Sequence, residues 1–202
     1  RSIYSNYSIT GLNPSTTYDG YIRGICGAGD SSLWIGPFSF TTLFECPPNA
    51  VCATYNSGDI PTDDLYLGQP LGSSSCPGVI SLTIPTGNVI DSVRTFLDMT
   101  AANGAWMSEQ RHRVKIDAPN VPIGPLRFGL NGNAAGTESY DYSFGSLYGY
   151  NIGDTVNFEL HAGRTWSSGG FNGCLTYNNK VDSSSWTVIA YYGPPVTCFR
   201  TT

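Results

Sequence analysis

The sequence predicts an all-β fold, and three observations lead to this prediction. Helical periodicity is almost absent, because apolar residues do not recur at three- and four-residue spacing and Gly or Pro interrupts nearly every stretch. Runs with period-two alternation recur along the chain instead. Clusters of Gly, Pro, Asn and Ser separate these runs. Short strands and turns in this order are typical of a β-sandwich or a jelly roll.

The alternating runs give the positions of the expected strands: 2–9, 18–25, 38–42, 79–84, 89–99, 111–116, 155–161 and 186–192. Turn clusters are expected at 85–88, 131–133 and 167–170. Tyr140, Tyr142, Tyr148 and Tyr150 have spacing two on either side of Gly145 and should line one face of a hairpin. That face is either a cover for the core or a stacking surface for a ligand.

The charge of the chain argues against nucleic acid as a partner. Charged residues make up 12% of the sequence, against roughly 25% in an average soluble domain. The net charge is -5, and the two lysines and the scattered arginines form no basic patch for a phosphate backbone. No apolar run reaches the ~20 residues that span a bilayer, so no membrane span is expected.

Cysteine usage favours disulfides and an oxidising location outside the cytoplasm. Six cysteines occur with only two histidines, and no CxxC pair gives zinc-ligand spacing. Such cysteines are typical of secreted or cell-surface proteins, although the sequence does not select one pairing. The disulfide candidates are Cys46, Cys52, Cys76, Cys174 and Cys198.

The first 43 residues carry a family resemblance. The string YSITGLNPSTTYDGYIRGICGAGDSSLWIGPFSFTT resembles the second half of a fibronectin type III domain. Leu12, Pro14, Thr16 and Tyr18 match the turn between the fifth and sixth strands of that family. The resemblance implies that the Tyr18 hydroxyl caps upstream backbone while its ring covers the core. It also implies that residues 27–34 form a loop and 38–42 the final strand.

This fibronectin resemblance is incomplete. The family has two sheets, and residues 1–43 supply only about its last three strands, which alone would expose an apolar face and a sheet edge. We therefore expect the chain to be part of a longer polypeptide, or another chain to cover the remnant. The opening at Arg1 agrees with the first expectation, and Cys26 would then pair with a missing strand.

A second domain is expected at residues 44–193, because FECPPNAVC marks a boundary near Phe44. GPPVTCFRTT predicts a linker to a further module at residues 194–202. The second domain resembles β-sandwich modules that occur among fibronectin repeats in secreted and cell-surface proteins of Bacteroidetes. The strings that carry this resemblance are CATYNSGDIPTDDLYLGQPLGSSSCPG, DSVRTFLDMTAANGAWMSEQRHRVKI and FELHAGRTWSSGGFNGC. Such modules accompany peptidases, glycanases or adhesins.

Catalytic motifs are not apparent in the sequence. There is no G-x-S-x-G elbow and no HExxH, and the triad-like string 29–31 is far in sequence from either histidine. Strand alternation places His161 and Glu159 on one face, where a structural histidine is favoured over a metal ligand. The chain is therefore expected to be non-catalytic, with no catalytic residues.

Binding of a polysaccharide or cell-surface glycan is the expected function, because sugars are recognised by exposed aromatic faces together with polar groups. Tryptophans flanked by Gly and Ser are plausible platforms. The alternative is that they cover the open ends of the sandwich while the arginines pair with carboxylates such as Glu109 or Asp98. The candidate ligand-binding residues are Trp106, Glu109, Arg111, Arg164, Trp166, Tyr140 and Tyr142.

Two further kinds of site are expected from short patterns. Asp59, Asp63 and Asp64 offer carboxylates for a calcium ion in a loop, or serve turns by capping their own backbone. Apart from calcium, no cofactor is expected. Residues 91–93 and 154–156 resemble the O-glycosylation acceptor of Bacteroidetes, which implies a glycan on Ser92 or Thr155 unless the side chain points into the core.

The sequence as a whole predicts a non-catalytic module of a secreted or cell-surface multi-domain protein that serves adhesion or carbohydrate binding. Its other partners would be neighbouring modules of the same polypeptide. One alternative is a structural spacer in an adhesive filament. Another is an accessory domain of a secreted peptidase or glycanase.

Overall fold

The computed structural model describes residues 9–13, 16–27, 29–42, 44–64, 74–117, 124–130, 132–145, 155–170 and 173–195. These residues form strands and a single 3-10 turn, η1 (Met107–Glu109), so the all-β prediction is confirmed. The chain divides into two compact units, Arg1–Cys46 (unit 1) and Pro47–Thr202 (unit 2). In the described part of the chain, no helix is long and apolar enough to cross a membrane.

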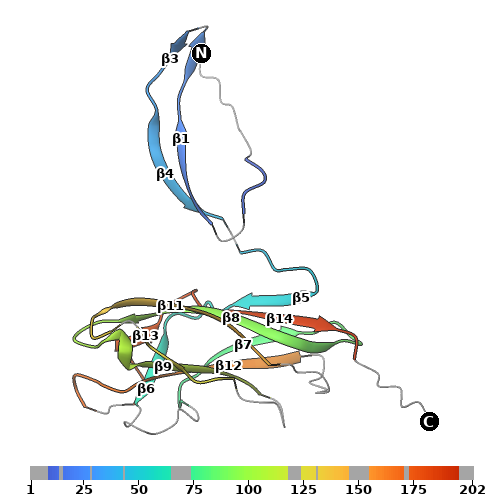
Figure 1. Cartoon of the computed structure of the whole chain (residues 1–202), viewed down its shortest axis with the longest axis vertical. Coiled ribbons are helices and arrows are strands. Elements are labelled where there is room, and N and C mark those ends of the chain that lie inside the picture. Colours follow the sequence, from blue (N-terminus) through green and yellow to red (C-terminus); the bar gives the residue numbers. More distant parts are fainter. Residues whose placement is uncertain are drawn as a thin grey trace. The chain divides into compact units, whose positions relative to one another are not determined.

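Unit 1 is a β-ribbon (Figure 1). Its strands are β1 (Thr17–Ile22), β2 (Ile25–Gly27), β3 (Asp30–Ser31) and β4 (Ile35–Thr41). β1 pairs antiparallel with β4, and β2 pairs with β3. Tyr18 lies opposite Phe40, and this aromatic pair alternates with the polar pair Thr17 and Thr41. One face of the ribbon is therefore apolar and the other polar.

Tyr18 has the contact that the sequence predicts for its hydroxyl, which accepts the backbone N–H of Asn13 at 2.9 Å. Its ring stacks on Phe40 with centroids 6.0 Å apart. No described side chain of unit 1 is buried, so the ring covers a neighbour on the ribbon and not a core. The expected loop at 27–34 is corrected as well, because β2 and β3 make a short hairpin there.

Unit 2 is a two-layered arrangement of ten strands, which Figure 1 shows as stacked ribbons. The expected strands at 79–84, 89–99, 111–116, 155–161 and 186–192 are confirmed, and β11 contains Tyr140 and Tyr142, whose spacing predicts a strand; the sequence does not predict β5, β6, β10 or β13. The strands are β5 (Ala50–Thr54), β6 (Ile60–Asp64), β7 (Gly78–Thr83), β8 (Val89–Ala101), β9 (Gln110–Ile116), β10 (Arg127–Phe128), β11 (Gly136–Phe144), β12 (Thr155–Arg164), β13 (Leu175–Val181) and β14 (Thr187–Gly193).

The two layers are each built around one long strand. β8 pairs with β11, β13 and β14, and β5 follows β14. β12 pairs with β9 and β7, and β10 follows β9. β6 belongs to both layers, because Ile60–Thr62 pairs with β13 while Asp63 and Asp64 pair in parallel with β12.

The core lies between the layers and follows strand alternation. Along β9, Gln110, His112, Val114 and Ile116 are buried while the residues between them are not. Full burial of an aliphatic or aromatic side chain contributes roughly 1.5–3 kcal/mol. Trp186 is completely buried, and its indole N–H donates to the Thr95 hydroxyl at 3.0 Å, which satisfies the one polar atom of the ring.

The expected turns agree with the structure where it describes them. The Asn88 N–H donates to the Pro85 carbonyl at 3.1 Å, and the Gly170 N–H donates to the Ser167 carbonyl at 3.3 Å. The sequence predicts a loop at 59–64, which is wrong. Residues Ile60–Asp64 form strand β6, because they pair with both β12 and β13. Some expectations lie outside the described residues. These are part of the 131–133 turn, the strand expected at 2–9 as far as Ser8, and the residues Tyr148, Tyr150 and Cys198.

Candidate functional site

Two tryptophans that the sequence singles out are brought close to one turn of unit 2. The turn between β8 and η1 contains Gly104 with φ of +89°, and a Cβ at this position would lie 3.3 Å from Cη2 of Trp166. The Trp166 ring therefore lies against the backbone two residues before Trp106. Trp106 is 43% exposed and Trp166 is 39% exposed, which leaves a large part of each side chain open to solvent.

Backbone and side-chain hydrogen bonds fix these two segments. The Thr165 N–H donates to the Glu109 carbonyl at 3.1 Å, which continues the β9–β12 pairing into η1. The Glu109 carboxylate accepts the Trp106 N–H at 2.9 Å. Glu109 thus holds the Trp106 turn through its side chain and the Trp166 loop through its carbonyl. Both tryptophans therefore lie on backbone segments that are tied by hydrogen bonds to Glu109.

Neutral polar groups lie on the segments that carry the tryptophans and on the neighbouring strand β13. The Asn103 side chain donates to the Tyr177 carbonyl at 2.6 Å, and Tyr177 is 61% exposed. Asn178 is buried, and its side-chain carbonyl accepts the Ser167 hydroxyl at 3.2 Å. The sequence did not point to Tyr177 or to Asn178, because β13 is polar and was not predicted to be a strand. We call Gly104, Trp106 and Trp166 the tryptophan surface.

Arg111 lies beside this surface. Its Nη1 donates to the carbonyls of Ser108 at 2.9 Å and Gln110 at 2.7 Å. Its guanidinium stacks 4.7 Å from the centre of the exposed Phe128 ring. Burial lowers the pKa of Arg111 from its ordinary value.

Arg164, also predicted to contact a ligand, is instead completely buried, which corrects that prediction. It occupies an inward position of β12, and its Nη2 pairs with Asp64 at 2.6 Å and donates to the Gly173 carbonyl at 2.7 Å. Its Nη1 donates to the carbonyl of Thr62, the residue two positions before Asp64 on β6. A buried guanidinium requires such partners, and Arg164 holds β6 against β12.

Tyr140 and Tyr142 cover the core, so the prediction that they bind a ligand is corrected. Tyr140 is only 9% exposed, and its hydroxyl donates to the Gln110 side chain at 2.9 Å. Its ring contacts the His112 ring edge-on at 4.3 Å, and Tyr142 packs against the same histidine. Burial raises the pKa of both tyrosines. Their side chains face inward because they share one face of β11.

The three aspartates expected to bind calcium are not brought together, and each has a protein partner. Asp59 pairs with Lys180 at 2.8 Å, which lowers the pKa of the carboxyl. Asp63 accepts from the Ser75 N–H at 2.7 Å and hydroxyl at 2.8 Å; these bonds lower its pKa although burial opposes them. Asp64 pairs with Arg164. Strand pairing of β6, which the sequence did not reveal, separates these carboxylates.

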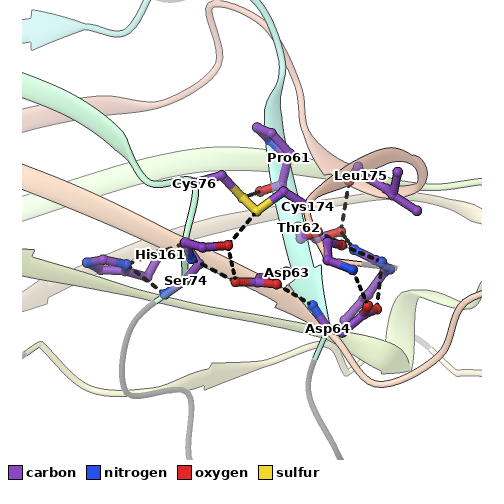
Figure 2. Close-up of a disulfide and its surroundings, with 12 residues drawn as sticks. Pro61, Thr62, Asp63, Asp64, Ser74, Cys76, His161, Cys174 and Leu175 are labelled. Atoms are coloured by element: carbon purple, nitrogen blue, oxygen red, sulfur yellow. Dashed lines mark hydrogen bonds and ion pairs between the residues drawn. A yellow bond between two sulfur atoms is a disulfide. The ribbon is translucent and has the colours of Figure 1, made fainter. Parts of the chain in front are cut away.

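A disulfide joins Cys76 and Cys174, with Cα atoms 6.2 Å apart (Figure 2). Among the described residues, the one group of His, Cys, Asp or Glu side chains with metal-site geometry is Asp63 with these two cysteines. Since both sulfurs are in the disulfide, neither is a thiolate ligand. Cys46 and Cys52 are also disulfide-bonded, so the disulfide prediction is confirmed for four of its five candidates.

His161 forms a buried chain of contacts with Ser74 and Glu159. Its Nδ1 accepts the Ser74 N–H at 3.0 Å, and its Nε2 lies 2.9 Å from the Glu159 carboxylate. Burial lowers the pKa of His161, although Glu159 opposes this. Because the backbone N–H of Ser74 occupies the Nδ1 lone pair, that nitrogen is not free to take a proton from the Ser74 hydroxyl. This geometry is that of a structural histidine.

Ser92 and Thr155, the residues expected to carry glycans, both lie outside the core. Ser92 is half-buried on β8, and Thr155 is exposed at the start of β12. Their positions leave the glycosylation prediction open to test.

Comparison with known proteins gives little beyond these observations. No family model and no curated protein sequence matches the chain. Among solved structures, it matches the ectodomain of ANX1 from Arabidopsis thaliana with a TM-score of 0.28 and 10% identity. The match covers 76% of this chain and 42% of the other, so this chain spans less than half of that protein's length. A similarity of this size identifies neither a family nor a function.

Proposed function

We propose that unit 2 is a carbohydrate-binding module of a secreted or cell-surface protein, and that it binds a polysaccharide or cell-surface glycan through the tryptophan surface. The observation that carries this proposal is the pair of exposed tryptophans on adjoining segments, 43% and 39% exposed. Aromatic faces pack against the C–H surface of sugars, and nearby polar groups bind hydroxyls. Asn103 and the serines of residues 167–168 supply such groups.

Two further observations support this proposal. The disulfide Cys76–Cys174 fits an oxidising compartment such as the cell exterior. His161 and Arg164 are the kinds of side chain that could take part in catalysis, but the hydrogen bonds of His161 and the ion pair of Arg164 give both residues structural roles. The first observation supports the location of the module, and the second favours a module that binds and does not catalyse.

Unit 1 fits the proposal as the remnant of a fibronectin type III repeat in a multi-domain polypeptide related to the secreted proteins of Bacteroidetes. The hydrogen bond from Asn13 to the Tyr18 hydroxyl supports this assignment, because the resemblance predicts that contact. Recovery of the full-length gene tests it. A neighbouring run of fibronectin repeats is expected, and a gene with no such repeat would contradict it.

Retention on immobilised polysaccharides tests the binding role. Trp106→Ala and Trp166→Ala should each weaken retention by about tenfold, which corresponds to ~1.4 kcal/mol, because each removes a stacking face. The melting temperature should change by only a few degrees, since both side chains lie at the surface and are partly exposed. Trp34→Ala in unit 1 is the matched control, because Trp34 is 60% exposed and lies outside the tryptophan surface.

Two outcomes would contradict the proposal. If both variants unfold, the tryptophans cover the end of the sandwich and serve stability. If the wild-type protein is retained by no polysaccharide and binds nothing on a glycan array, the spacer alternative is favoured over a binding module.

A further inference from the structure

The Arg111 guanidinium is held in place by its surroundings before any ligand arrives. Nη1 donates to two backbone carbonyls, those of Ser108 and Gln110, and the Phe128 ring lies under the guanidinium plane. Ser108 belongs to η1, the same turn that begins after Trp106. A long side chain fixed in this way loses little conformational entropy when it binds a partner.

Arg111 also differs from Arg94 and Arg164 in its charge partners. Arg94 forms an ion pair with Asp141 at 2.6 Å, and Arg164 forms one with Asp64. Within the described ranges, Arg111 makes no ion pair. Glu109 is the nearby carboxylate, but one of its oxygens accepts the Trp106 N–H.

The unused donors of Arg111 have the geometry that a carboxylate needs. The two carbonyl contacts occupy Nη1, which leaves the N–H groups of Nε and Nη2. These two nitrogens form the planar fork that binds both oxygens of one carboxylate. Arg111 is partly desolvated, so an ion pair there is stronger than one between fully exposed groups.

We infer that the glycan bound at the tryptophan surface is acidic, and that Arg111 binds a sugar carboxylate through Nε and Nη2. This inference rests on the proposed carbohydrate-binding function and adds the class of ligand. A polymer that stacks on Trp106 extends past η1 to the guanidinium. The net charge of -5 opposes approach only weakly, because charges more than about 8 Å apart are screened at physiological ionic strength.

The test compares acidic polysaccharides with neutral ones in affinity electrophoresis. The acidic probes are polygalacturonate, alginate and hyaluronan, and the neutral probes are fully methyl-esterified polygalacturonate, a β-glucan and a galactan. The wild-type protein should be retarded by at least one acidic probe. Retardation by polygalacturonate, where it occurs, should fall roughly tenfold on esterification, because the ester removes the charge-assisted hydrogen bonds and keeps the sugar rings.

Arg111→Lys keeps the positive charge and removes the fork, so it should weaken binding of the acidic probe several-fold. Arg94→Lys is the matched control, because Arg94 is already paired with Asp141, and it should bind like the wild type. Melting temperatures of both variants establish that they are folded. If Arg111→Lys does not fold, Phe128→Ala, which removes the ring under the guanidinium, replaces it and should also weaken binding of the acidic probe.

The outcomes separate this inference from the proposed function. Trp106-dependent binding to neutral probes alone overturns the acidic ligand and leaves the carbohydrate-binding function intact. Equal binding of the acidic probe by Arg111→Lys and wild type overturns the role of Arg111. Binding to no probe overturns both the inference and the function.

Discussion

Replacing His112 by phenylalanine should remove a large part of the acid sensitivity of unit 2. His112 is completely buried and packs edge-on against Tyr140, and neither ring nitrogen has a hydrogen-bond partner among the residues that the structure describes. Burial, with a smaller contribution from the charge of Arg127, lowers the pKa of His112 from 6.5 to about 3. The folded protein therefore keeps this histidine neutral under conditions in which the unfolded chain protonates it.

The sign and size of the effect follow from proton linkage. The unfolded state binds more protons than the folded state between the two pKa values, so stability is fully present above pH 6.5 and is lost as the pH falls toward about 3. At about pH 4.5, two pH units below the unfolded pKa, the loss from this one residue is about 2.7 kcal/mol. Carboxylates with a lowered pKa, such as Asp63, also cause a loss of stability in acid, but mainly at lower pH than His112 does.

Urea unfolding followed by tryptophan fluorescence measures this effect, since Trp186 is buried in the same core. Between about pH 7.5 and 4.5, the free energy of unfolding should fall in both proteins. The fall in His112→Phe should be smaller than the fall in the wild type by about 2.7 kcal/mol. His161→Gln is the control, because it keeps His112 and should therefore still show the pH-dependent loss of stability that His112 causes. An equal fall in wild type and His112→Phe would refute the reasoning.

Two further substitutions test how unit 2 is packed. A Cβ on Gly129 would clash with the Met107 carbonyl oxygen, so Gly129→Ala should destabilise by roughly 1–3 kcal/mol in thermal melts. Gly193→Ala is the control and should be neutral, because a Cβ there would meet no described atom within 4 Å. Equal melting temperatures of the two variants would contradict the predicted clash at Gly129. Replacing Cys76 and Cys174 together by alanine should lower the free energy of unfolding by about 2–4 kcal/mol in urea titrations. An unchanged urea midpoint in that variant would show that the disulfide adds no stability.

Strong alternation made some strands predictable and its absence hid others. β8, β9, β12 and β14 carry regular apolar positions, so the sequence reveals them. β6 and β13 do not: β6 begins in a segment of aspartates, and β13 buries Asn178 and Asn179 where apolar residues would be expected. Their burial depends on partners far away in sequence, which periodicity does not report.

The candidate site was predicted in part for the same reason. Loops rich in Gly and Ser mark Trp106 and Trp166 as candidates, Arg111 is a polar group close to Trp106 in sequence, and the structure places these three residues around one turn. Arg164 is a polar group close to Trp166 in sequence in the same way, but it is buried. Its partner Asp64 lies on another strand, so residue type alone could not distinguish a surface arginine from an internal ion pair.

The dual pairing of β6 has a mechanical consequence. Tension applied at Trp166 enters β12, and β12 is hydrogen-bonded to β6 at Asp63 and Asp64. The other half of β6 is bonded to β13, so the pull is distributed into both layers instead of peeling one away. A module anchored in this way should hold a tethered polymer under flow until the main-chain ladder of β6 shears.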